Sequence, residues 1–147
     1  MFIDEVTSSG AMPTLEMMMR FAGARQRVLS HNIANIDTPN FRPADVSPSG
    51  FQRALAEAVQ RRRAATGGET GELAWKDTRE VRAVPGGAGG LELSPRTHSG
   101  NILFHDRNNR DLERTMQDVV ENVTVFRTAV DFMRGRAEIL KLAMTER

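Results

Sequence analysis

The sequence predicts a mainly α-helical protein whose long N- and C-terminal helices pair as a coiled-coil-like hairpin, with a Gly-rich loop region and weak short strands between them. Three observations predict this fold: a heptad pattern in the first quarter of the chain, a longer one in the last quarter, and many glycines in between. The 147 residues divide into an N-terminal helix and turn (1–42), a variable, loop-rich middle segment (43–105) and a C-terminal heptad helix (106–147). At this length the three parts should form one structural domain.

The N-terminal helix is predicted to begin near Pro13 and Thr14. Its apolar residues recur every seven positions, with Ile33 beside the same face: Leu15, Ala22, Leu29 and Ile36. The helix should end before Pro39, because proline has no N–H to donate and disfavours the helical backbone at Thr38.

A turn is predicted directly after this helix, at Thr38, Pro39, Asn40 and Phe41. Pro39 would occupy the second position of a type II turn, and Asn40 the third, where the backbone needs a positive φ that asparagine tolerates. The turn would reverse the chain after the N-terminal helix.

The middle segment is predicted to hold one short helix and little other regular structure. Ser49 is a candidate N-cap for a helix that uses Phe51, Leu55 and Val59 as its apolar face and ends by Gly67. Residues 67–100 contain eight Gly and two Pro, a composition that excludes long helices. Residues 73–75 and 81–84 are weak strand candidates.

The C-terminal helix, predicted over residues 111–145, carries the most regular pattern of the chain. Ten apolar residues, which we call the seam, follow one another at alternating intervals of four and three: Leu112, Met116, Val119, Val123, Phe126, Val130, Met133, Ala137, Leu140 and Met144. Gly135 lies off the seam and should cost only about 1 kcal/mol relative to alanine.

The seam needs a partner, because a solitary helix cannot bury ten side chains that are worth roughly 1.5–3 kcal/mol each. The N-terminal helix offers about three heptads, so part of the seam should remain for other chains. The same pattern would also suit an antiparallel hairpin inside a monomeric helical bundle.

Composition and motifs argue against an active site. The chain has no cysteine, and His31, His98 and His105 show no metal-ligand spacing. We therefore expect no catalytic, cofactor-binding or metal residues, no cofactor and no small-molecule substrate. The net charge of +1 argues against nucleic acid as a partner, although the basic run Arg61–Arg63 could touch phosphate. A solvated helix end is the favoured interpretation of that run.

The chain also lacks membrane and secretion signals. No stretch approaches the roughly 18 apolar residues that span a bilayer, so we expect no membrane-spanning helix. Asp4 and Glu5 stand where a secretory signal would carry cations and an apolar run, so no cleavable signal peptide is predicted.

Two stretches give the chain a resemblance to a known family. Residues 28–42 read VLSHNIANIDTPNFR, and residues 108–116 read NNRDLERTM. The first closely resembles the N-terminal signature of bacterial flagellar basal-body rod and hook proteins, and the second is similar to the segment that opens their C-terminal helix. The short length favours the proximal rod member of the family. Asn40 stands where the family usually has Gly, and Arg107 and Arg110 replace a Gly and a Val in the loop that enters the last helix.

The resemblance implies a structural subunit of the proximal rod, part of the axial drive shaft that transmits motor torque and forms a tube for exported proteins. The implied partners are copies of the same chain, other rod proteins, and the adaptor and export-gate components at the rod base. The implied location is the rod within the periplasmic space, reached unfolded through the flagellar type III apparatus without a cleaved signal.

Assembly and packing are expected to depend on the two heptad patterns and on the signature and turn. Besides the seam, the candidate residues are Leu15, Ala22, Leu29, Asn32, Ile33, Asn35, Ile36, Thr38, Pro39, Asn40 and Phe41. Two alternatives remain open from the residues alone: a coiled-coil scaffold or adaptor unrelated to flagella, and a nucleic-acid-associated helical protein that uses Arg61–Arg63.

Overall fold

The computed structural model describes residues 9–68, 70–84, 90–97 and 112–145. Three helices dominate this part of the chain: α2 (Met12–Ala34), α3 (Pro48–Thr66) and α4 (Leu112–Thr145). Four short strands accompany them: β1 (Ala44–Asp45), β2 (Val81–Ala83), β3 (Leu91–Leu93) and β4 (Arg96–Thr97). The predicted mainly helical fold, with short strands between contacting terminal helices, is confirmed.

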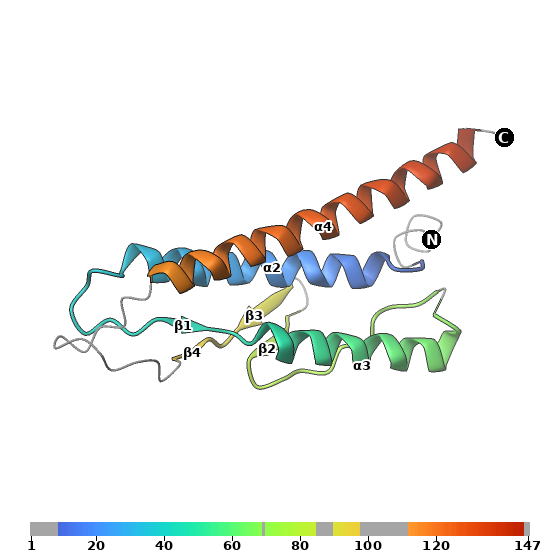
Figure 1. The fold of residues 1–147 in the computed structure, drawn as a ribbon. Helices are drawn as coiled ribbons and strands as arrows, with labels where there is room; N and C mark the ends of the chain where they lie inside the picture. The colour runs from blue at the N-terminus through green and yellow to red at the C-terminus, as the bar shows by residue number, and fades with distance from the viewer. Residues whose placement is uncertain (1–8, 69, 85–89, 98–111, 146–147) are drawn as a thin grey trace.

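Helix α2 is the central element of the fold. Figure 1 shows α2 between α4 on one side and α3 with the strands on the other. Arg25 of α2 contacts Asp118 of α4, and Ala22 contacts Asn122, so α4 runs antiparallel to α2. Towards its own C-terminus α4 diverges from α2 (Figure 1). Within the described residues, no helix combines the length and the apolar composition that crossing a membrane requires.

The main apolar core lies between α2, α3 and the strands. The rings of Phe21 and Phe51 stack with centroids 3.8 Å apart, and Trp75 packs against Phe51 at 5.7 Å. Val46, Leu55 and Val81 complete the buried cluster. None of the buried residues in this cluster comes from α4.

The strands form two small antiparallel pairs, β1 with β4 and β2 with β3. The strand predicted at residues 81–84 is confirmed as β2, but the one predicted at 73–75 is wrong. There, the Trp75 amide donates to the carbonyl of Leu73 at 2.8 Å, which folds the backbone locally instead of pairing it with a strand. Strands β1, β3 and β4 are not visible in the sequence, because two or three residues are too few for an alternation of apolar and polar side chains.

Helix α3 begins two residues earlier than predicted. Its N-cap is Ser47, whose hydroxyl accepts a hydrogen bond from the amide of Gly50 at 3.0 Å. Ser49, the predicted cap, lies inside the first turn and its hydroxyl contacts that of Ser47 at 3.0 Å. Pro48 explains the shift, because proline suits the first helical position, where no N–H is needed. The predicted end is confirmed: Gly67 closes the helix with a left-handed backbone at φ 73°.

The chain reversal after α2 has the features of the predicted type II turn. The amide of Phe41 donates to the carbonyl of Thr38 at 3.1 Å, which closes the turn. Asn40 has φ 61°, the one positive φ among the described residues other than glycine. Asn35 adds a hydrogen bond from its side-chain amide to the carbonyl of His31 at 2.9 Å, which satisfies one acceptor at the end of α2.

The Asn40 backbone predicts opposite effects for two substitutions. Asn40→Gly should keep the stability within a few tenths of a kcal/mol or raise it, because glycine adopts a positive φ freely. Asn40→Val should lower the unfolding free energy by about 1–2 kcal/mol, because a β-branched residue is strained there. Urea unfolding of the purified chain measures both. Equal stability of Asn40→Val and Asn40→Gly would contradict the turn assignment.

Candidate assembly surface

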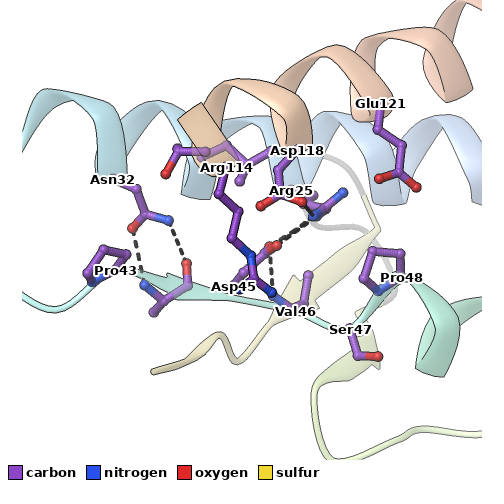
Figure 2. Close-up of a pocket in the computed structure, with 13 residues that line it drawn as sticks. Arg25, Asn32, Pro43, Asp45, Val46, Ser47, Pro48, Arg114, Asp118 and Glu121 are labelled. Carbon is purple, nitrogen blue, oxygen red and sulfur yellow. Dashed lines mark hydrogen bonds and ion pairs between the residues drawn. The ribbon is translucent and has the colours of Figure 1, made fainter. Parts of the chain in front are cut away.

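A buried arginine, Arg25, connects helix α2 with strand β1 and helix α4. Arg25 of α2 is only 3% exposed and forms a bidentate ion pair with Asp45 of β1. Its Nε donates to Oδ1 at 3.0 Å and its Nη2 to Oδ2 at 2.6 Å. The same Nη2 reaches Oδ1 of Asp118 on α4 at 3.4 Å (Figure 2). One guanidinium thus connects α2, β1 and α4.

The charges around Arg25 favour its protonated form. Burial lowers its pKa, but the hydrogen bond from Arg25 to Asp45 and the negative charges of Asp45, Asp118 and Glu121 raise it more. The net pKa lies above the ordinary value of an arginine, so Arg25 stays charged wherever the protein is folded. Because a buried charge without a partner is costly, both carboxylates are needed beside it.

Asn32 fixes β1 against α2 from the other end of the same junction. Its side-chain amide donates to the carbonyl of Ala44 at 2.8 Å, and its Oδ1 accepts from the amide of Ala44 at 3.2 Å (Figure 2). The side chain of Asn32 therefore pairs with β1 as a neighbouring strand would. The signature residue Asn32 has a structural role inside this subunit.

Asn122 plays the corresponding role between α2 and α4. It is buried, and its side-chain amide donates to the carbonyl of Ala22 and to Oε1 of Gln26, both at 2.9 Å. With Ala129, it is one of the two buried residues of α4. We call the side of α4 that faces α2 the docking face; its residues are Thr115, Asp118, Asn122, Val125 and Ala129. This face is largely polar or small.

The seam lies beside the docking face and does not coincide with it. Val123 and Val130 each follow a buried docking residue by one position, which is a rotation of about 100° around the helix. Leu112, Met116 and Phe126 are 44%, 45% and 38% exposed. Half of the ten seam residues therefore remain exposed after α4 has docked on α2.

The predicted assembly and packing residues differ in how deeply they are buried. Leu15, Ala22, Leu29 and Asn32 are buried, Ile33, Asn35, Ile36 and Phe41 are half-buried, and Thr38, Pro39 and Asn40 are exposed. Within the seam, Val119, Val123, Val130, Met133 and Leu140 are half-buried, whereas Leu112, Met116, Phe126, Ala137 and Met144 are exposed. The structure thus brings the N-terminal group into the subunit and leaves the turn and half of the seam at the surface.

Sequence reasoning missed Arg25, Asp45, Asp118 and Asn122. A signal was present, because Arg25 and Asn32 continue the heptad spacing of Ala22 and Leu29. Polar residues at such positions specify register rather than contribute apolar burial.

The prediction that Arg61–Arg63 form a solvated helix end is wrong for Arg62. Arg62 is buried, and its guanidinium donates to the carbonyls of Gly10 and Thr70. Arg61 is exposed but donates to the carbonyl of Ala74 at 3.1 Å. Both arginines therefore hold loops against α3.

The histidines show no metal site within the part of the chain that the structure describes, where no group of three His, Cys, Asp or Glu residues could hold an ion. His31 is exposed on α2, with its ring edge against Phe41 at 5.7 Å. His98 and His105 lie outside the described residues, as does the loop with Arg107 and Arg110.

Comparisons with known proteins point to one kind of assembly. The chain is 28% identical to the flagellar basal body rod protein FlgB of Bacillus subtilis (strain 168) over 138 residues, covering 93% of this chain and 95% of the relative. It is also 28% identical to the protein of the same name from Borrelia hermsii over 109 residues, covering 69% of this chain and 71% of that relative. No protein-family model and no solved structure matches the chain.

Removal of the Arg25 guanidinium should be strongly destabilising. Arg25→Met leaves the carboxylate of Asp45, which is only 16% exposed, without its ion-pair partner and should cost about 3–5 kcal/mol in urea unfolding. Arg25→Lys keeps the charge but loses the bidentate geometry, so its loss should be intermediate.

The matched control for this prediction is Arg20→Met, which removes an exposed ion pair with Glu16 one helical turn away. Its effect should be about 0.5 kcal/mol or less. If Arg25→Met and Arg20→Met had the same stability, the central role of the junction would be refuted.

Proposed function

This chain is a homologue of flagellar basal body rod protein FlgB, and we propose that it forms the wall of the proximal rod as a structural subunit, with the seam as its main contact to neighbouring subunits. Its role is structural rather than enzymatic. The homology covers both terminal helices and the middle segment, so it favours the rod over the unrelated scaffold that heptads alone leave open.

The observation that carries the assembly role is the exposure of the seam. The two buried residues of α4, Asn122 and Ala129, lie on the docking face, and five of the ten apolar seam residues stay exposed in the subunit. An exposed apolar stripe of this length is unusual for a monomer and is typical of an interaction surface. Burial of the seam against another helix would supply the apolar free energy that the hairpin does not collect.

The polar docking face complements this role. Asn122 and Arg25 allow α4 to dock on α2 in one register, because any slip would bury their polar groups without partners. The hairpin therefore presents its seam at a fixed angle to the next subunit. A rod that transmits torque needs contacts whose geometry is reproducible from one subunit to the next.

The exposed part of the seam and the rod-protein relatives support other rod subunits as partners. Copies of this chain and other rod proteins would pack against the seam, and the adaptor and export-gate components at the rod base would contact the first ring of subunits. No nucleic acid and no small molecule is needed for this role.

The homology supports a location in the flagellar basal body rod. The finer location that we propose is the part of the rod within the periplasmic space, reached by export of the unfolded chain through the flagellar type III apparatus. The absence of cysteine and the small apolar core suit a chain that must be unfolded for export.

The turn at residues 38–41 would divide the subunit. It reverses the chain so that α2 and α4 can form the wall of the tube while residues 43–105 lie outside it. The exposed tip of the turn and the ties from Asn32 to β1 support this division.

A charge within the seam should abolish assembly without unfolding the subunit. Met116→Asp and Phe126→Asp place a carboxylate where a neighbour would bury it, at a cost of several kcal/mol in the rod. Because Met116 is exposed in the isolated subunit, Met116→Asp should change the unfolding free energy of the subunit by about 0.5 kcal/mol or less. Motility and recovery of basal bodies from the bacterium that encodes the protein are the measurements.

Thr128→Asp is the matched control, because Thr128 is exposed and lies two positions from Phe126, on nearly the opposite side of α4. It should leave motility close to wild type. Normal numbers of basal bodies with Met116→Asp and Phe126→Asp would refute the seam as the assembly contact.

A further inference from the structure

The C-terminal part of α4 carries an apolar pattern that belongs neither to the seam nor to the docking face. Phe132, Ile139 and Leu142 are 63%, 64% and 65% exposed. With Gly135, they follow one another at intervals of three, four and three residues, which is the spacing of positions a and d in a heptad. We call these four residues the C-terminal stripe.

The C-terminal stripe is exposed because it lies beyond the start of α2. The antiparallel register places Asn122 of α4 at Ala22 of α2, and α2 begins ten residues earlier, at Met12. The start of α2 therefore lies near Phe132, and the remaining residues of α4 extend about 20 Å past it. Figure 1 shows this end of α4 diverging from α2.

The C-terminal stripe and the seam occupy different sides of α4. Ile139 precedes the seam residue Leu140 by one position, and Leu142 precedes Met144 by two. These offsets are rotations of about 100° and 200° around the helix. A partner on the C-terminal stripe therefore leaves the seam open.

The residue types of the stripe suit a parallel pair of helices. Phe132 and Ile139 take position a of the heptad, and Gly135 and Leu142 take position d. Isoleucine at a with leucine at d favours two parallel strands. A Cβ built on Gly135 meets nothing within 4 Å, so this position leaves room for the ring of Phe132 from each of two helices.

The flanking charges distinguish a parallel pair from an antiparallel one. Asp131 takes position g and Arg136 takes position e, five residues later. In a parallel pair, position g of one helix faces position e of the other five residues on, so each Asp131 would face an Arg136 of the other copy. In an antiparallel pair, equivalent flanks would meet, and like charges would face each other.

Both charges are available for such a contact. Asp131 is 76% exposed, and its distance to Arg134 is 4.0 Å. Arg136 is exposed beside Gly10 and forms no ion pair with another residue that the structure describes. Exposed pairs within one helix contribute little, so they do not compete strongly with a contact between two helices.

The helix that carries the stripe is already formed in the subunit. Residues 132–145 make only about two heptads, a length at which helix nucleation from an unfolded chain is unfavourable. Here they continue a helix whose earlier residues Asn122 and Ala129 are buried on the docking face. Pairing of two stripes therefore orders side chains without first having to form the helix.

We propose that the C-terminal stripe binds the same stripe of a second copy of this chain, as a parallel two-stranded coiled coil over residues 132–145. The docked Ala129 lies about 80° around the helix from Ile139, so a two-fold axis along the pair places the two bodies on different sides. This inference concerns the purified subunit and does not rest on the proposed function.

Sedimentation equilibrium of the purified full-length subunit tests the proposal. At high micromolar concentration the subunit should form dimers. Ile139→Asp should weaken the dimer at least about tenfold, because it places two like charges in one apolar layer. Met144→Asp is the matched control, since Met144 is 63% exposed on the same part of α4 but belongs to the seam. It should leave the dissociation constant within about threefold of the wild type.

A charge exchange tests the parallel direction. Asp131→Arg alone should weaken the dimer about tenfold, because each introduced cation would face Arg136 of the other copy. Asp131→Arg combined with Arg136→Asp should restore the dissociation constant to within about threefold of the wild type, since the pairs are re-formed with their signs exchanged.

Single cysteines give an independent measurement, because the chain has no cysteine of its own. In a parallel pair, the two copies of position 142 lie in one layer, so Leu142→Cys should form disulfide-linked dimers under mild oxidation. Met144→Cys is the control, because its two thiols would lie on outer sides of the pair. Leu142→Cys should crosslink at least about tenfold faster.

Four results would each overturn the proposal: a subunit that stays monomeric, equal dimerisation of Ile139→Asp and Met144→Asp, no recovery by the charge exchange, or equal crosslinking of Leu142→Cys and Met144→Cys. The seam variants are judged by recovery of basal bodies, a separate measurement. Failure of the C-terminal stripe in solution would therefore leave the proposed rod contact standing.

Discussion

The ion pair of Arg25 with Asp45 and Asp118 is the contact on which the arrangement of the other elements depends. It holds β1 against α2 immediately after the turn, and this placement sets the direction in which the chain enters α3. The same guanidinium fixes the first turns of α4 from a position 93 residues away in sequence. A buried cation is stable only when its partners are all in place, so these three elements are specified together.

The two sides of α4 have different roles: the docking face contacts α2 within the subunit, and the seam is the proposed contact with neighbouring subunits. The docking face, with Asp118 and Asn122, gives the hairpin a single register but little apolar burial. The neighbouring seam is apolar throughout, half of it stays exposed in the subunit, and the proposed assembly would bury it. If the two sides were exchanged, the hairpin would be more stable, but its outer surface would be polar and would offer little free energy for assembly.

The sequence was sufficient to predict the helices, the positive φ of Asn40 and the end of α3 at Gly67, because periodicity, proline and glycine act locally. It also contained an unused signal for Ser47, since Pro48 suits the first position of a helix. Two heptad patterns, the seam and the docking face, run side by side along α4. Periodicity could not predict which of them packs on α2, because both have the same spacing. The choice depends on the pairing of Asp118 with a distant arginine, and the two-residue strand β1 depends in the same way on Asn32.

The separation of the apolar core from α4 has a further consequence for how the last helix is attached. Phe21, Phe51 and Val81 hold α2, α3 and the strands together without any side chain of α4. The last helix is attached through Asn122, Ala129 and the Arg25 junction, which contribute two hydrogen bonds and an ion pair, and half-buried valines of α4 lie beside them. Local stability follows buried apolar contacts, and the cluster around Phe21 and Phe51 contains no residue of α4, so release of α4 would leave this cluster intact.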